Sequence, residues 1–429
     1  MRKPIDTATQ CLISECYLKR RYGNVFSLYI GSRPAVVLNG LEVVREALVT
    51  HAEEYAGRPT HLLISHLFES KVVGIALANY GCSWRDHRRF ALTTLRQFGL
   101  GKRSMEMGIL EEVSHICTEL ESSAGGSTDP QHLFHLTESN IICSLIFGER
   151  FEYDDPVILT LIQSLEELTK EAFGPWAMLY GIISVLRPLH FPFRNVSHKF
   201  NQMKEHIKKI VTKDKSSRVM GEPRDLLDYG VLLLDLFMAG TDTTSNTLRS
   251  AVLHLMTNQH VQDRCYREIA DVLEGRADAS FEDRHAMPYV QAMIHEVQHM
   301  SDTVSLGVFR TTCSDTQLHS YQLPQGTMVI PNLSSVMHEE GQWKFPHEFN
   351  PENFLNEVGE FVKPEAFLSF SAGSRVCLGE GLARMELFLV LVTLLRRVPD
   401  FSLIFGGTQS QKPFRIPEKG QNCERPDKT

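Results

Sequence analysis

Apolar positions recur along this chain with a helical period over most of its length. From about residue 84 to residue 275 the pattern is mostly helical. We expect breaks between these helices at four glycine- or proline-bearing points: Gly99, Gly125-Gly126, Pro156 and Pro223. A striped helix ends at Gly275, and another begins at Pro288. No strand–helix–strand rhythm is present, which argues against a Rossmann enzyme.

Short strands are predicted only near the ends of this helical region. Residues 25–38 alternate as a hairpin, and a further strand is expected around residues 327–330. Asn39 is predicted to cap the next helix, with Glu42 completing a capping box. The fold class is therefore mainly α with small β-sheets (α+β), and we expect one domain over residues 1–429.

Composition and charge narrow the class of protein. The chain is 42% hydrophobic and 22% charged, which is ordinary for a globular protein with a sizeable core. Its net charge of −8 argues against a nucleic-acid partner. Nine cysteines without a CxxC pair indicate reduced thiols facing the cytosol. No stretch is long and apolar enough to span a bilayer, so a membrane anchor is not expected within this chain.

One run of residues carries the strongest chemical signal. Residues 370–379 read F-x-x-G-x-R-x-C-x-G and lead directly into a helical pattern. Gly373 and Gly379 allow positive φ and a close approach to a flat ligand. Backbone N–H groups favour a thiolate at Cys377, and Arg375 can reach an anionic group of the same ligand. This combination suits a haem iron with an axial cysteine, whereas a buried cysteine in a turn is the plainer alternative.

The run resembles the haem-binding loop of the cytochrome P-450 superfamily, the haem-thiolate monooxygenases. The resemblance extends over about residues 22–403 and is nearest to animal microsomal family 2, particularly the D-type oxidases. Residues 151–156 and 363–368 are similar to that group. The resemblance implies haem b as the cofactor, Cys377 as the iron ligand and Phe370 as part of the binding loop.

A second constellation lies at residues 239–244, Ala-Gly-Thr-Asp-Thr-Thr, after an apolar helical run. The Thr243 hydroxyl can bond back to the Ala239 carbonyl and open a groove for dioxygen and water. Gly240 costs about 1 kcal/mol relative to alanine, which close approach to a ligand would explain. The run resembles the oxygen-activating helix of the family, with Asp242 and Thr243 as the acid and the alcohol that deliver protons. The alternative is a buried helix that these residues merely kink.

Asp235 lies one turn before Ala239, on the same helix face as Thr243. A carboxylate between leucines needs a partner. It could select a cationic amine substrate, or it could accept hydrogen bonds from neighbouring backbone N–H groups. The sequence leaves both readings open.

Several cations are predicted around the haem and on the adjoining surface. Trp84 and Arg88 share a helix face at i, i+4, and both could bind a haem propionate. The resemblance adds Arg310 and Arg375 as further propionate ligands. Four more cations are expected to face the redox partner: Arg85, Arg89, Lys102 and Arg103.

The chain departs from the family pattern at a structural network. Glu296 and His299 occupy the positions of the family's Glu-x-x-Arg pair, and Asn353 stands where a cation is usual. Histidine cannot copy the five-donor fork of arginine. We therefore expect Glu296 to be under-compensated, at a cost of about 3–5 kcal/mol. In addition, a helix before residue 229 is missing, and the final hairpin after Gly406 is not legible.

The sequence thus predicts a monooxygenase that inserts one atom of dioxygen into apolar or amine-bearing molecules, such as xenobiotics, lipids or steroids. By resemblance, electrons come from NADPH–cytochrome P-450 reductase, with cytochrome b5 as a second partner, at the cytosolic face of the endoplasmic reticulum membrane. Residues 173–193 resemble the loop that roofs the substrate pocket and dips into the membrane, although an ordinary core helix is the alternative. The rival functions are a degenerate form that binds haem weakly or not at all, and a haem isomerase that needs no reductant.

Overall fold

The computed structural model describes eight stretches of the chain, to which the account below is confined. They are residues 17–30, 33–60, 74–97, 103–122, 130–172, 194–213, 223–398 and 401. The following parts of the sequence discussed above lie outside the described residues: Gly99, Lys102, Gly125-Gly126, residues 173–193 and the segment after Gly406.

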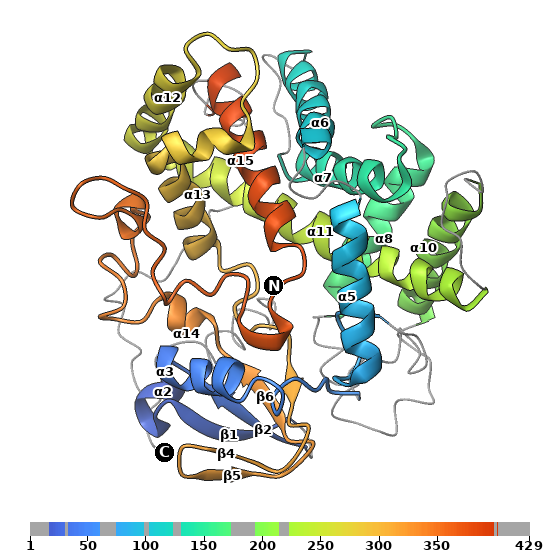
Figure 1. The fold of residues 1–429 in the computed structure, drawn as a ribbon, viewed down its shortest axis with the longest axis vertical. Helices are drawn as coiled ribbons and strands as arrows, with labels where there is room; N and C mark the ends of the chain where they lie inside the picture. The colour runs from blue at the N-terminus through green and yellow to red at the C-terminus, as the bar shows by residue number, and fades with distance from the viewer. Residues whose placement is uncertain are drawn as a thin grey trace, which may run out of the picture.

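Long helices dominate the described part of the chain, as predicted (Figure 1). They are α5 (Cys82–Gln97), α6 (Arg103–Ser122), α7 (Pro130–Phe147), α8 (Pro156–Ala172), α10 (Arg194–Lys213), α11 (Pro223–Thr257), α12 (Gln259–Leu273), α13 (Pro288–Ser301) and α15 (Glu380–Arg397). Shorter helices are α2 (Tyr17–Tyr22), α3 (Leu41–Arg45) and α14 (Ser334–Met337), and a π-helical turn covers Glu46–Thr50. Pro156, Pro223 and Pro288 each open a helix, because the first helical position needs no N–H donor.

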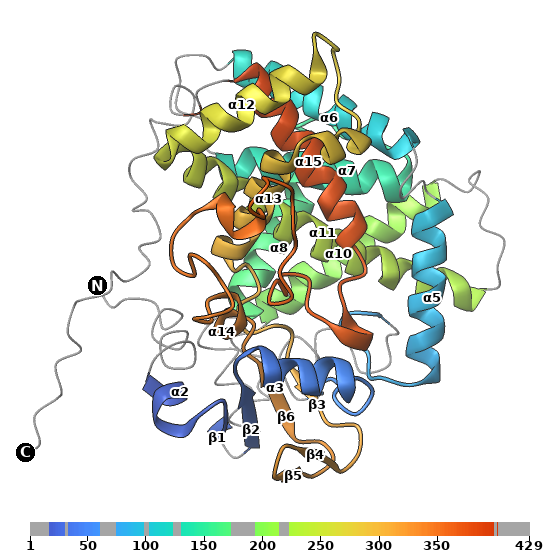
Figure 2. The same ribbon diagram turned by 60° about the vertical axis from the view of Figure 1, so that its left-hand side comes forward.

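Two small sheets lie at one end of the molecule, beside α3 (Figures 1 and 2). Their strands are β1 (Val25–Ile30), β2 (Arg33–Leu38), β3 (Arg310–Thr311), β4 (Thr316–Leu318), β5 (Tyr321–Leu323) and β6 (Met328–Pro331). The larger sheet has the order β1-β2-β6-β3. The predicted hairpin is confirmed as the antiparallel β1–β2 pair. β2 then pairs in parallel with β6, matching Val37 with Ile330.

α11 passes through the middle of the helical region, where it packs against α7, α8, α10, α12, α13 and α15 (Figures 1 and 2). α7 is buried on nearly every side, as expected for a helix with no polar face. α11 therefore runs between α7 and α15, the helix that follows the cysteine loop. This arrangement brings the two sequence motifs into one region of the fold.

The predicted capping role of Asn39 is wrong. Gly40, at φ 78°, precedes α3, and no side chain caps this helix end locally. Asn39 accepts a hydrogen bond from the side chain of Asn332 instead (2.8 Å). The N–H groups of Gly40 and the next residue donate to Ser335 Oγ and Glu339 Oε2, at 2.9 and 2.8 Å. Contacts from nearly 300 residues away thus replace the local cap.

Among the described helices, none combines the length and the apolar character needed to cross a bilayer.

Candidate active site

The cysteine loop of residues 370–379 is a closed turn held against the π-helical segment. Its ends are tied by a hydrogen bond from the Cys377 N–H to the Phe370 carbonyl (3.0 Å). Gly373 has φ 72°, and a Cβ at this position would overlap the Leu48 carbonyl oxygen. Glycine is therefore required here both by its conformation and by the close backbone contact. The predicted reason for this glycine is thus partly different, since the structure shows it meeting protein backbone.

The Cys377 thiol is exposed just before the first turn of α15. The protein atoms around it raise the pKa of the thiol by desolvation, and Glu380 adds to this effect. Backbone N–H groups of Gly379 and Glu380 and the Arg88 guanidinium lower the same pKa. These donors are the groups that would favour a thiolate once a metal ion replaces the proton.

Three arginines are buried beside this loop: Arg58, Arg310 and Arg375. Burial, and then the neighbouring guanidinium groups, lower the pKa of each to about 9, so all three stay cationic near neutral pH. No carboxylate within the described residues forms an ion pair with any of them. Because an uncompensated buried charge is costly, this cluster calls for an anionic partner.

The hydrogen bonds of these arginines go almost entirely to backbone carbonyls. Arg375 donates to the carbonyls of Ala56 (2.9 Å), Ile75 (3.1 Å) and Ala78 (2.7 Å). Carbonyl groups orient a guanidinium but do not neutralise its charge. The cluster is thus fixed in place and retains its full positive charge.

Arg310 and Arg58 follow the same principle. Arg310 donates from Nη2 to Ser371 Oγ (3.2 Å) and the Ala372 carbonyl (3.4 Å), while its buried Nη1 has no partner in the described structure. Arg58 donates to three carbonyls, including that of Ala76 (2.8 Å). Arg58 was not predicted from the sequence, because no spacing pattern links this residue to the cysteine loop. Only the fold brings Arg58 close to the loop.

Trp84 and Arg88 lie next to the arginine cluster, and their binding of a haem propionate stays a prediction. The indole N–H of Trp84 donates to the Ile75 carbonyl (3.0 Å), and the Arg375 guanidinium stacks 4.2 Å from the ring centroid. Arg88 donates to the Val376 carbonyl (2.6 Å), one residue before the cysteine. Trp84 is therefore a platform for Arg375, and Arg88 braces the cysteine loop.

The sequence left two roles open for Asp235: binding a cationic amine substrate, or accepting hydrogen bonds from backbone N–H groups. The geometry supports the second role. Its Oδ2 accepts hydrogen bonds from the N–H groups of Ile75 (2.6 Å) and Ala76 (3.1 Å). Burial raises the pKa of this carboxyl, and the two N–H bonds lower it. The same two residues present their carbonyls to the arginines, so Asp235 holds the turn that orients the cluster.

The acid–alcohol motif has the predicted local geometry on α11. The Thr243 hydroxyl donates to the Ala239 carbonyl (2.7 Å), and both residues are exposed on one face of the helix. Asp242 is half-buried and accepts a hydrogen bond from Asn246 Nδ2 (3.2 Å). A Cβ at Gly240 would lie 2.7 Å from Ile142 Cδ1 on α7, so helix packing also favours glycine here. Its role in the close approach of a ligand stays a prediction.

Comparison with known proteins identifies the family of this chain. The family model for Cytochrome P450 matches residues 12–416. This chain belongs to the cytochrome P450 family. Cytochrome P450 2D26 of Rattus norvegicus is 39% identical over 412 residues, 91% of this chain and 82% of the relative. The Vitamin D(3) 25-hydroxylase of Sus scrofa is 40% identical over 407 residues, 90% and 81% of the two chains. Cytochrome P450 2D15 of Canis lupus familiaris is 42% identical over 445 residues, 96% and 88%.

These matches confirm the predicted membership and the likeness to animal family 2, D-type forms included. Cytochromes P450 are monooxygenases that bind haem b through a cysteine thiolate, so the chain is an oxidoreductase of this class. The residues present fit that cofactor. Cys377 offers an accessible thiol at a helix start, and the buried arginine cluster, with the unpartnered Arg310 Nη1, suits the two carboxylates of a haem.

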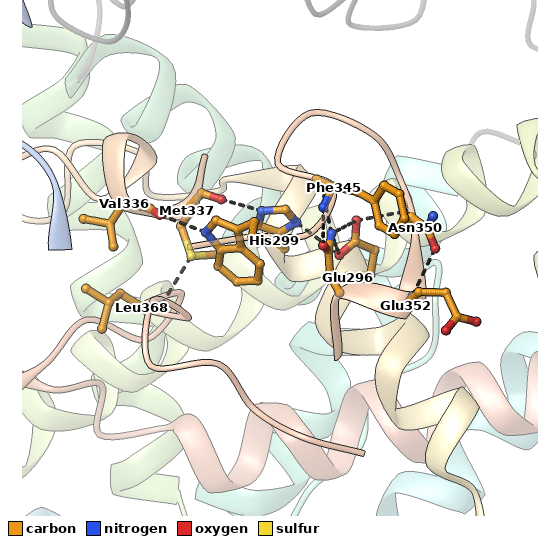
Figure 3. A network of polar contacts seen from close by, with 10 residues as sticks. Glu296, His299, Val336, Met337, Phe345, Asn350, Glu352 and Leu368 are labelled. Carbon is orange, nitrogen blue, oxygen red and sulfur yellow. Dashed lines mark hydrogen bonds and ion pairs between the residues drawn. The ribbon is translucent and has the colours of Figure 1, made fainter. Parts of the chain in front are cut away.

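The Glu296 network differs chemically from the family pattern but is not short of hydrogen bonds (Figure 3). Glu296 Oε1 accepts the N–H of Asn350 (2.9 Å), and the Asn353 amide reaches both carboxylate oxygens, at 3.3 and 3.1 Å. His299 Nδ1 lies 3.1 Å from Oε2. Glu296 is therefore well supplied with hydrogen bonds, because a backbone N–H and an amide stand where cations were expected. The predicted shortage of positive charge around it stays a prediction.

The hydrogen bonds of His299 imply that one proton lies between its ring and the carboxyl group of Glu296. Nε2 of His299 bonds the carbonyl of Met337, an acceptor only, so Nε2 must carry a hydrogen. Nδ1 faces the carboxyl of Glu296, and a second proton must therefore lie between these two groups. Burial raises the pKa of Glu296, although the bonds from His299, Asn350 and Asn353 lower it. The ring is also stacked on Trp343, with centroids 4.0 Å apart.

Proposed function

We propose that this cytochrome P450 inserts one atom of dioxygen into apolar organic molecules, and that Cys377 would hold the iron of its haem. The carrying observation is the juxtaposition of the exposed Cys377 thiol with three buried arginines that no described carboxylate neutralises. When bound, haem b supplies the redox-active iron at which dioxygen is reduced. Arg310, Arg375 and Arg58 would hold its propionates, and Gly373 keeps the loop seated against Leu48.

Proton supply is assigned to α11. Thr243 holds its hydroxyl hydrogen toward the Ala239 carbonyl, and this leaves the oxygen lone pairs free to bind a water or a second donor. Asp242 is next along the helix and half-exposed, so its carboxyl can exchange protons with that water. This pair favours oxygenation over an isomerase reaction, which needs no protons for O–O cleavage.

The substrate class rests on the site and on relatives. One relative is named as a vitamin D(3) hydroxylase, which is consistent with an apolar substrate. Asp235 Oδ2 is occupied by two backbone N–H groups, so we do not assign this carboxylate as the partner of an amine-bearing substrate. We therefore rank apolar molecules, such as sterols, above amines.

The redox partner would dock on α5. Arg85, Arg88, Arg89 and Arg96 surround a surface hollow of about 230 Å³, a basic patch suited to an acidic electron donor. The donor we propose is NADPH–cytochrome P-450 reductase, with cytochrome b5 as a second one. The family resemblance further suggests the cytosolic face of the endoplasmic reticulum membrane as the place of action.

The test is oxygen incorporation by the haem-loaded protein, with NADPH and reductase, under ¹⁸O₂. Vitamin D3 and a set of sterols serve as substrates, and Cys377→Ala serves as the control. We expect products carrying one ¹⁸O atom only when reductase and NADPH are present. Rearranged product without reductant would support the isomerase, and absence of turnover with a normal haem content would contradict the proposal.

A further inference from the structure

A buried histidine links Asp242 to the surface of the molecule. His135, on α7, has a side chain only 2% exposed. Its Nδ1 lies 3.0 Å from Glu166 Oε1 on α8, and its Nε2 lies 3.5 Å from Asp242 Oδ1 on α11. The Glu166 side chain is 44% exposed, so the three groups form a continuous path from solvent to Asp242.

The contacts of His135 with Glu166 and Asp242 are close, but their geometry is not that of a hydrogen bond. Neither ring nitrogen of His135 has a hydrogen-bond partner in the described structure, although each faces a carboxylate. A buried imidazole with both nitrogens unsatisfied is costly, so a structural role alone does not explain it. Contacts of this kind are often long or misaligned in a resting site and tighten when substrate binds.

We propose that His135 is a positioning residue that carries protons from Glu166 to Asp242 during turnover. The inference rests on the proposed monooxygenase function. Each turnover consumes one substrate molecule, one dioxygen, two electrons and two protons, and gives one oxygenated product and one water. For each proton, His135 accepts a proton at Nδ1 from Glu166 and releases the Nε2 proton to Asp242, which leaves the neutral ring in its Nδ1–H tautomer. The ring regains the Nε2–H tautomer by reorienting before the next transfer, and Glu166 recovers its proton from solvent.

The chain offers matched controls for both members of this path. Glu167 follows Glu166 directly but pairs with Lys199 (3.6 Å) and accepts a hydrogen bond from Gln163 (2.9 Å). His132 lies one turn before His135 on α7 and is exposed. Changes at Glu167 and His132 thus alter the same residue types on the same helices without touching the path.

The first experiment measures the path without turnover. The haem-loaded protein, with ¹⁵N-labelled histidine rings, is observed in the diamagnetic carbon-monoxide-bound form, and the ring ¹⁵N resonances of His135 are compared between variants. Glu166→Gln and Asp242→Asn should each shift these resonances, because each change removes a carboxylate that faces one ring nitrogen. Glu167→Gln should leave them unchanged. If neither Glu166→Gln nor Asp242→Asn shifts these resonances, the contacts do not exist in solution and the proposal fails.

The second experiment measures coupling, using whichever substrate shows ¹⁸O incorporation. His135→Gln keeps a polar side chain of similar reach but cannot take up a proton. We expect about a 10-fold lower rate of product formation, below the 10²–10⁴-fold contribution of a positioned acid itself. The solvent deuterium isotope effect should rise, and hydrogen peroxide should replace product, while His132→Gln behaves as wild type.

The two experiments separate the failure of this inference from failure of the proposed function. An unchanged isotope effect and unchanged product per NADPH in His135→Gln would overturn the proton path even if the enzyme is active. An inactive wild type would contradict the proposed function, whereas the ring resonances of His135 would still report on the contacts. Because His135→Gln changes a buried residue and could misfold, Glu166→Gln, which changes an exposed residue, serves as a second variant. It should show the same change in isotope effect.

Discussion

Replacing Arg310 should change the stability of the apoprotein and its haem retention in opposite directions. Burial and Arg375 lower the pKa of Arg310 to about 9, which corresponds to about 5 kcal/mol of unfavourable interaction with the charged form. Only two weak hydrogen bonds, of 3.2 and 3.4 Å, offset this cost. An Arg310→Met change removes the charge and keeps an unbranched side chain. We expect the apoprotein to gain about 1–4 kcal/mol.

Haem binding should respond the other way. A charge-assisted hydrogen bond to a propionate contributes about 1.5–3 kcal/mol, so its loss should weaken haem affinity about 10- to 100-fold. The assays are denaturant unfolding of the apoprotein and the rate of haem loss to an acceptor protein. Arg276→Met is the control, because this arginine lies on the surface beside Asp283, at 2.9 Å, and should change neither quantity.

The reasoning would be refuted if the Arg310→Met apoprotein were less stable than wild type. It would also be refuted if the variant kept its haem as firmly as wild type does. Either result would mean that this guanidinium is not held ready for an anionic ligand.

Three further predictions concern the loop, a buried acid pair and the Glu296 network. Gly373→Ala should abolish stable haem binding, because a Cβ there meets backbone at positive φ, whereas Gly108→Ala on α6, with open space around it, should not; haem content of the purified variants decides this. Burial and nearby carboxylates raise the pKa of Glu138 well above its ordinary value, and burial raises that of Glu386 to about 8. The folded state therefore holds protons that the unfolded chain has released, so stability is full below about pH 4 and is lost as the pH rises toward about 8, at up to about 1.4 kcal/mol per pH unit and proton. Glu138→Gln should flatten this slope in unfolding measured between pH 5 and pH 8, and an unchanged slope would contradict the assignment. His299→Ala should cost about 3–5 kcal/mol and His299→Phe, which keeps the stacked ring, clearly less; equal losses in denaturant unfolding would mean that packing on Trp343 contributes little.

Contacts between residues close together in the sequence could be predicted from it, whereas contacts between distant segments could not. The Thr243–Ala239 bond follows from helical spacing alone, and it has the predicted form. The Cys377 loop is also local, because its glycines and the following helix start define it. That Cys377 ligates the iron stays a prediction, as does a single domain over the whole chain.

Where the prediction failed, a group distant in the sequence had taken the expected place. Asn39 lost its capping role because Ser335 and Glu339 satisfy the helix start. Glu296 is compensated partly by the N–H of Asn350, which no side-chain pattern reveals. Arg58 joins the cluster only because the fold carries it there. Backbone donors and acceptors leave little trace in the sequence, so such partners need the three-dimensional structure.

The most direct test of Cys377 as the ligand of the haem iron is the reduced, carbon-monoxide-bound absorption spectrum of the purified chain. Wild type should show the red-shifted Soret band of a thiolate-ligated haem, and Cys377→Ala should lose it. A band at the unshifted position in wild type, or a protein that retains no haem, would contradict the assignment of Cys377. In that case the degenerate, non-catalytic reading should replace the monooxygenase.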